Sequence, residues 1–233
     1  MTAFDTTQPI SPEPILPEAA RLWPRHLVDI FLRPKRFFSG QLALGSTPYV
    51  LFVTWLLGLS SAIDRVDGHL VKADLGTATL NPLLERAVSS WPLYWACVLV
   101  AGVLAGAGLW YVGGWWYRVR AGWAGARDPD PRLARLVYVY SGFVVALPAV
   151  SVVVLWTLAF PDYRTAWTDD QSFWSLALVV FPFWSCWASF RGVTSVFEVS
   201  RAKAAVWFLV LPSALYLLLI GGVALAYMFG VGG

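Results

Sequence analysis

Long apolar stretches without a charged residue alternate with short polar segments along this chain. The stretches cover residues 37–63, 87–117, 136–161, 171–190 and 204–233. Each can hold the ~20 apolar residues that a helix needs to cross a bilayer. We therefore predict transmembrane helices at about 42–63, 91–117, 135–160, 171–191 and 204–229, which together with their loops make a membrane domain over residues 37–233. The segments between these helices are too short for a separate soluble domain.

The segment before the first apolar stretch has a different pattern. In residues 21–36, Leu27, Ile30 and Phe31 share one helical face, while Arg25 and Asp29 lie elsewhere. An amphipathic helix of this kind lies in the plane of the membrane interface. The fold class predicted is therefore an all-α integral membrane protein with five transmembrane helices preceded by an amphipathic interfacial helix.

The junction "FLRPKRFFSGQL", residues 31–42, joins this helix to the first predicted span. A cation at the centre of a bilayer costs about 2.5–3.5 kcal/mol, so Arg33, Lys35 and Arg36 belong at the headgroups. Pro34 suits the first turn of a new helix. We expect Phe37 and Phe38 to enter the lipid beyond it. Residues 1–20 contain four prolines, three acidic residues and no cation, which is typical of a disordered tail rather than a signal peptide.

Composition agrees with the membrane class. Of the 233 residues, 58% are hydrophobic and 13% are charged, whereas soluble domains average about 25% charged. Lysines and arginines on alternate flanks of the predicted spans number thirteen against four. The positive-inside rule then places the N-terminus in the cytoplasm and the C-terminus on the opposite side. For a bacterial inner membrane, the opposite side is the periplasm.

Small residues and prolines in the spans predict how the helices pack. Gly102 and Gly106 form a GxxxG pattern that allows another helix to approach closely, either in the same chain or in a second copy. Pro148, Pro182 and Pro212 predict kinks in the last three spans. Kinks of this kind can line a transport path. We predict that they serve packing instead, because no ionisable residue accompanies them within the predicted spans.

Candidate chemistry is sparse. His26 and His69 fall on opposite sides of the predicted membrane, and no phosphate-binding loop, nucleophile elbow or zinc motif is present. Cys97 and Cys186 lie at depths too different for a disulfide. We predict no catalytic, cofactor-binding or metal-binding residues, no cofactor and no nucleic-acid partner. A membrane enzyme acting on lipid or peptidoglycan precursors stays open as a third possibility, with Glu198 and His26 as its residues.

Three short motifs resemble the Yip domain family of Ypt-interacting membrane proteins and their bacterial relatives. They are "PKRFFSGQL" at 34–42, "DPDPRLARLVYVYSGFVVALP" at 128–148 and "WASFRGVTSVFEVSRAKAAVWFLVLP" at 187–212. The resemblance implies five spans and a cytoplasmic N-terminus. It implies no common chemistry for the bacterial members. The short acidic tail does not reproduce the cytoplasmic segment that eukaryotic members associate with small GTPases.

The leading hypothesis from the sequence is a non-catalytic, Yip-like protein of the bacterial inner membrane that scaffolds or regulates a membrane partner. Its partners would be membrane lipids and either another membrane protein or a second copy of this chain. The residues expected to contact headgroups or a partner are Arg33, Lys35, Arg36, Arg191, Glu198, Arg201 and Lys203, the last four as a salt-bridged cluster. The alternative is a transporter or lipid-moving protein that uses the proline-kinked spans. A polar groove at mid-depth beside Pro148 and Pro182 would favour that alternative.

Overall fold

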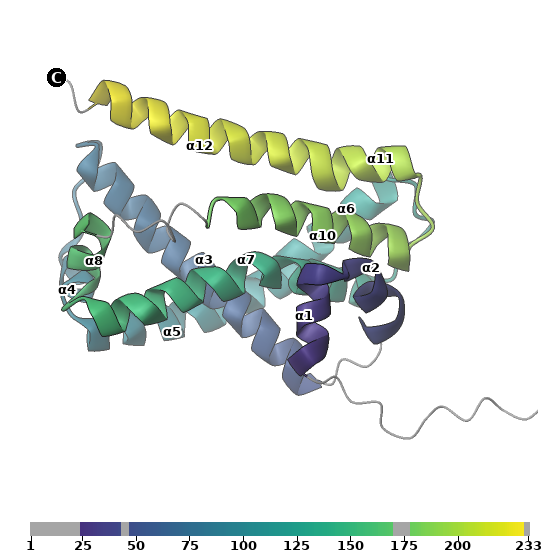
Figure 1. Ribbon diagram of the computed structural model, residues 1–233, viewed down its shortest axis with the longest axis horizontal. Coiled ribbons are helices and arrows are strands. Elements are labelled where there is room, and N and C mark those ends of the chain that lie inside the picture. The colour runs from purple at the N-terminus through teal and green to yellow at the C-terminus, as the bar shows by residue number, and fades with distance from the viewer. Residues whose placement is uncertain (1–23, 43–46, 170–177, 231–233) are drawn as a thin grey trace, which may run out of the picture.

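The computed structural model describes residues 24–42, 47–169 and 178–230, and its secondary structure there is entirely helical (Figure 1). The predicted tail at 1–20 lies outside the described residues. The helices in chain order, with η for π-helical segments, are α1 (Pro24–Leu32), α2 (Pro34–Arg36), η1 (Phe37–Gln41), α3 (Thr47–Asp74), α4 (Pro82–Val88), α5 (Trp91–Gly108), η3 (Leu109–Gly113), α6 (Gly114–Trp123), α7 (Pro131–Ala159), α8 (Tyr163–Asp169), α10 (Val180–Val196), α11 (Arg201–Ala205), η4 (Val206–Val210) and α12 (Leu211–Gly230).

Four helical runs among the described residues are long and apolar enough to cross a membrane: Thr47–Asp74, Trp91–Trp123, Pro131–Ala159 and Arg201–Ala226. The prediction of an all-α membrane protein is confirmed to the extent that the described residues are helical and include four candidate spans. The fourth predicted span corresponds in part to α10, which has 17 described residues. Residues 171–177 of that span lie outside the described residues, so the count of five spans stays a prediction.

Helix α3 extends further than the apolar pattern indicated. It continues without a break from Thr47 to Asp74, whereas the predicted span ended at residue 63. Asp64 and Asp67 are therefore helical residues within a candidate span and not loop residues. The candidate span therefore contains ionisable groups that the uncharged stretch alone did not indicate, because the helix does not end where that stretch ends.

Helices α3 and α5 approach each other closely at three glycines. A Cβ atom placed on Gly58 would lie 2.0 Å from the carbonyl oxygen of Gly102 and 2.6 Å from the backbone nitrogen of Gly106. The two backbones therefore touch where all three residues lack a side chain, as small-residue interfaces in membranes allow. Gly102 and Gly106 pack against a helix of the same chain.

The three prolines occupy different local positions. Pro148 lies inside α7, while Pro182 lies in the first turn of α10 rather than near a helix centre. Pro212 is the second residue of α12, which continues directly from η4. A π-helical turn is wider than an α-helical turn and interrupts the regular hydrogen-bond ladder, so it can accommodate a residue that has no backbone N–H.

The segment after α1 differs from its prediction. Phe37 and Phe38 are 0% and 3% exposed, and the ring of Phe37 packs edge-on against Tyr140 of α7 at 5.1 Å. The expectation that both rings enter the lipid is wrong. They anchor η1 to the bundle instead, because α7 and α10 present a better-packed apolar surface than a fluid acyl chain can provide.

The segment between α3 and α5 forms a short helix. Asn81 caps α4 by accepting a hydrogen bond from the backbone N–H of Leu84 at 2.7 Å, and Pro82 occupies the first helical position. An Asn–Pro pair favours this start, because Asn is a preferred N-cap residue and Pro suits the first helical position.

The α3–α5 contact gives the first testable prediction. Gly58→Ala should lower the free energy of unfolding by about 1–3 kcal/mol, since the new methyl group meets backbone atoms that cannot move aside. Thermal unfolding of the purified protein in detergent measures this. Gly68→Ala is the matched control on the same helix, because a Cβ there meets nothing within 4 Å. Equal melting temperatures for the two variants would contradict the contact.

Candidate functional site

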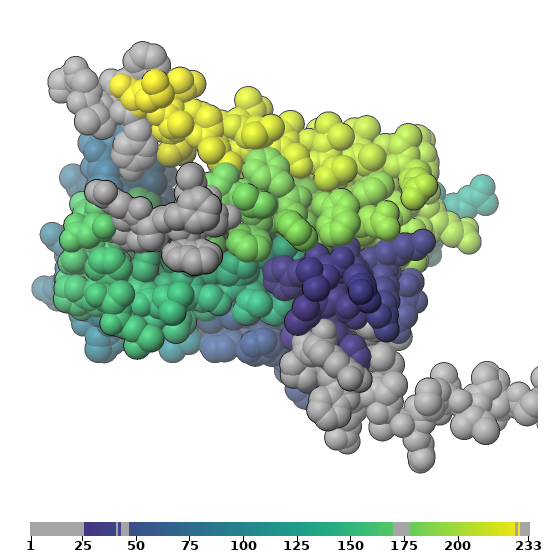
Figure 2. All heavy atoms as spheres, in the orientation of Figure 1, coloured from purple at the N-terminus to yellow at the C-terminus, as the bar shows by residue number. Residues whose placement is uncertain are grey.

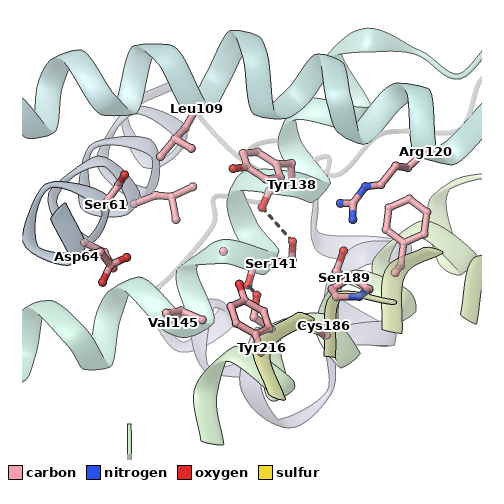
Figure 3. A pocket seen from close by; sticks show the side chains of 16 residues that line it. Ser61, Asp64, Leu109, Arg120, Tyr138, Ser141, Val145, Cys186, Ser189 and Tyr216 are labelled. Atoms are coloured by element: carbon pink, nitrogen blue, oxygen red, sulfur yellow. Dashed lines mark hydrogen bonds between the residues drawn. The ribbon is translucent and has the colours of Figure 1, made fainter. Parts of the chain in front are cut away.

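A partly open cavity of about 290 Å³ lies between α3, η3, α6, α7, α10 and α12, and Asp64 on its wall is exposed (Figure 3). We call it the central cavity. Ser61, Leu109, Val145 and Tyr216 line it, and each lies near the middle of one of the four candidate spans. The cavity therefore lies at mid-depth of the bundle.

The lining of the central cavity is unusually polar for a membrane bundle. Ser60, Ser141 and Ser189 are the buried polar residues recorded in the described part of the chain, and all three line it. Ser185 Oγ donates a hydrogen bond to the carbonyl oxygen of Ser141 at 3.0 Å. Since a hydroxyl oxygen has further acceptor capacity, these side chains can still bind a polar solute.

Arg120 of α6 projects its guanidinium group toward the central cavity (Figure 3). The guanidinium carbon lies 4.7 Å from the ring centre of Phe208 and 5.5 Å from that of Tyr117, distances typical of cation–π contacts. One terminal nitrogen donates to the carbonyl oxygen of Trp207 at 3.3 Å, while the buried Nε has no partner. The two ion pairs found in the described residues do not include Arg120, so it can bind an anionic group.

Asp64 of α3 lies on the opposite side of the cavity from Arg120, with Tyr138 and Ser141 drawn between them (Figure 3). Within the described residues, no hydrogen bond or ion pair to its carboxylate is found. The central cavity thus carries one unpaired cation and one unpaired anion on opposite walls.

A second cavity of about 180 Å³ continues from the first toward α8, and Asp64 and Val145 line both. Asp67, Tyr163 and Pro182 line this second cavity. The hydroxyl of Tyr163 donates a hydrogen bond to the Asp67 carboxylate. Burial raises the pKa of Tyr163, so its hydroxyl stays protonated and keeps donating to Asp67.

Aromatic rings pack around Tyr163 at the end of the bundle that carries α4 and α8 (Figure 1). The rings of Tyr94 and Tyr163 stack at 4.3 Å, and Trp91 packs edge-on against both. The indole N–H of Trp91 donates to the carbonyl oxygen of Phe160 at 2.8 Å. The ion pair between Arg164 and Asp74, at 2.9 Å, ties α8 to the end of α3. This end of the bundle is therefore held by a packed aromatic cluster and an ion pair.

The residues predicted from sequence to contact headgroups separate into two groups. Arg33, Lys35, Arg36 and Arg191 line one pocket between α2, η1 and α10, which we call the basic pocket. Glu198, Arg201 and Lys203 are not among its lining residues, and neither ion pair found in the described part of the chain includes them. The predicted salt-bridged cluster around Glu198 is therefore not formed.

Sequence reasoning missed the central cavity, although a signal was present. Leu57, Ser60, Ser61 and Asp64 follow the spacing i, i+3, i+4, i+7 and so share one face of α3. Tyr138, Ser141, Gly142 and Val145 repeat the same spacing on α7. Two faces with small and polar residues at this spacing indicate a polar cavity between them. Of the two free cysteines, Cys186 lines the cavity and Cys97 does not.

Pro182 and Pro212 line these cavities, and Pro148 lines neither of them. The polar groove that would favour the transport alternative is expected beside both Pro148 and Pro182, and the cavities meet this expectation at Pro182 alone. Across the described ranges, no group of three His, Cys, Asp or Glu side chains comes together as a metal site would require.

Comparison of the chain with protein-family models, with curated proteins and with solved structures found no match. The resemblance to the Yip family stays a proposal that rests on the three quoted motifs.

Water in the central cavity can be tested with an introduced cysteine. With Cys97 and Cys186 replaced by serine, Ser185→Cys should react with a charged methanethiosulfonate reagent about tenfold or more faster than Leu218→Cys, because the reactive thiolate forms only in contact with water. Ser185 lines the cavity, whereas Leu218 is 72% exposed on the apolar surface of α12. The rate of modification in intact membranes is the measurement. Equal slow rates would mean that the cavity is closed to water.

Proposed function

We propose that this protein is a transport protein that binds a small zwitterionic solute in the central cavity. The observation that supports this most directly is the placement of Arg120 and Asp64 on opposite walls, each without a charged partner in the described residues. Arg120 would bind the anionic group of the solute, and Asp64 would bind its cationic group.

Holding these two charges within candidate spans costs free energy. An ionised side chain within a membrane span costs about 2.5–3.5 kcal/mol near the centre of the helix, and such residues usually serve transport or ligand binding. A solute that carries both charges would compensate Arg120 and Asp64 at once. Neither Arg120 nor Asp64 forms an ion pair among the described residues, so neither charge is explained by helix packing through an ion pair.

Cavity size and lining limit the solute. A volume of about 290 Å³ is just below the range for small-molecule sites, which is about 300–1,000 Å³. The serine hydroxyls supply hydrogen bonds, and the second cavity beyond Asp64 provides a continuation toward α8. An amino acid or a similar small zwitterion fits these features.

The proposal includes a topology. We infer five spans, with α10 completing the fourth, in a bacterial inner membrane, with the end that carries α2 and α11 in the cytoplasm. The support is the thirteen-to-four distribution of cations between alternate flanks. In Figure 1, α10 lies alongside α7 and the α11–α12 run, as a further crossing helix would.

Binding can be tested with matched solutes. Glycine, serine and betaine are the zwitterionic probes, and ethanolamine and glycolate carry one charge each. A bound zwitterion at a hundredfold excess over its Kd should stabilise the protein by about 2.7 kcal/mol, measured by thermal unfolding. Arg120→Gln and Asp64→Asn should each remove most of this stabilisation, and radiolabelled-solute flux into proteoliposomes should fall with it.

Arg118→Gln is the matched control, because Arg118 lies on the same helix and pairs with Asp128 outside the central cavity. It should keep the response to zwitterions. If wild-type protein responds to none of these solutes, or if Arg120→Gln responds as Arg118→Gln does, the proposed function is wrong.

A scaffold that docks a partner membrane protein is the second candidate, and α12 favours it. Only 6% of the most apolar window of the α11–α12 run is buried, against 39% in α3. A partner helix could cover this surface. A photo-crosslinking residue at Leu218 should then give a defined protein adduct in native membranes, while one at Leu158 of α7, also well exposed, should not. Lipid adducts alone at both positions would remove this candidate.

A further inference from the structure

The basic pocket gathers four cations into one hollow of about 540 Å³. Arg33, Lys35 and Arg36 come from α2 and the residue before it, while Arg191 comes from α10, more than 150 positions later in the chain. No acidic residue is among the lining residues within the described part of the chain. None of the four side chains has a described hydrogen bond or ion pair with another residue.

The backbone beneath these cations is held firmly. Phe37 and Phe38, which follow directly, are buried in the bundle, and Pro34 is buried as well. A Cβ on Gly192 would come within 3.2 Å of the Phe38 ring, so the ring packs directly on α10 next to Arg191. The indole N–H of Trp184 donates to the carbonyl oxygen of Phe31 at 2.9 Å. These contacts hold like charges together in spite of their repulsion.

The surroundings of the pocket are apolar. Leu32, Pro34 and Trp187 complete much of its wall. Leu32 and Val28 of α1 are 67% and 52% exposed beside it. Figure 2 shows the surface of α1 and α2, in purple, lying against that of α10, in green. A basic hollow bordered by exposed apolar side chains matches a molecule with an anionic head and an apolar tail.

We propose that the basic pocket binds the phosphate-bearing headgroup of an anionic phospholipid, with the acyl chains on the apolar surface of α1 and α10. Arginine side chains bind phosphate oxygens through paired N–H donors, and the lysine adds a point charge. Basic pockets beside membrane helices bind anionic lipid headgroups in this way. The site is separate from the central cavity, because the two share no lining residue.

The test uses the full-length protein in nanodiscs of phosphatidylcholine that contain a minor fraction of phosphatidylglycerol. After release from the nanodiscs, native mass spectrometry counts the phospholipids retained per protein. Wild-type protein should retain phosphatidylglycerol in preference to phosphatidylcholine. Arg191→Gln alone should lower this preference about fivefold, and the triple variant Arg33→Gln, Lys35→Gln, Arg36→Gln should lower it about tenfold or more.

The double variant Arg201→Gln, Lys203→Gln is the matched control, since it removes charge from α11 at the same end of the bundle without touching the pocket (Figure 1). It should keep the wild-type preference. Thermal unfolding checks that each variant folds. If the triple variant does not fold, the single variant Arg191→Gln tests the proposal.

Three results would overturn the proposal. The first is equal retention of both phospholipids by the wild-type protein. The second is an unchanged preference in Arg191→Gln. The third is stabilisation by inorganic phosphate that Arg191→Gln abolishes, without retention of phosphatidylglycerol, because the ligand would then be a free phosphate compound rather than a lipid. None of these measurements depends on zwitterion binding in the central cavity. Each of the two proposals can therefore be wrong without the other.

Discussion

The backbone contact between Gly58 of α3 and Gly102 and Gly106 of α5 is the constraint on which the bundle depends. Between helices in lipid there is no hydrophobic driving force, so close van der Waals packing has to hold them. Three glycines bring the two backbones into contact at one point. Helix α3 crosses the bundle in Figure 1 and packs on α7 as well. The contact with α5 therefore fixes which face of α3 is directed at the central cavity.

That same face of α3 carries the polar residues. Ser61 and Asp64 lie about one and two turns beyond Gly58, and both line the central cavity. On the other wall, Gly142 of α7 lies against Leu57, since a Cβ there would come within 2.8 Å of a Leu57 methyl carbon. Tight packing at Leu57 and Gly58, and small polar side chains beyond them, leave a space in which Asp64 has no partner. The cavity is thus a consequence of where bulky and small residues alternate on α3.

Much of the fold could be predicted from the sequence, because lipid constrains it strongly. Apolar length predicts the spans, and Asn81–Pro82 predicts the start of α4, since both signals are local. The positions of Asp64 and Arg120 could not be predicted from charge counting. A charged residue next to an apolar stretch can begin a loop or continue the helix, and only tertiary packing decides. The burial of Phe37 and Phe38 could not be predicted either, because aromatic rings suit lipid and protein surfaces alike. Gly192, which is far along the chain, makes room for Phe38.

Helix α10 connects the two candidate sites. One of its faces contributes Ser185, Cys186 and Ser189 to the central cavity, and another contributes Trp187 and Arg191 to the basic pocket. Ser189 is tied to the buried Tyr117, whose hydroxyl donates to its carbonyl oxygen at 3.1 Å, and Tyr117 in turn supports Arg120. A shift of α10 would therefore move the wall of the central cavity and the environment of Arg120 together. A lipid bound in the basic pocket would favour one position of this helix, so the composition of the surrounding membrane would be coupled through α10 to the proposed solute site.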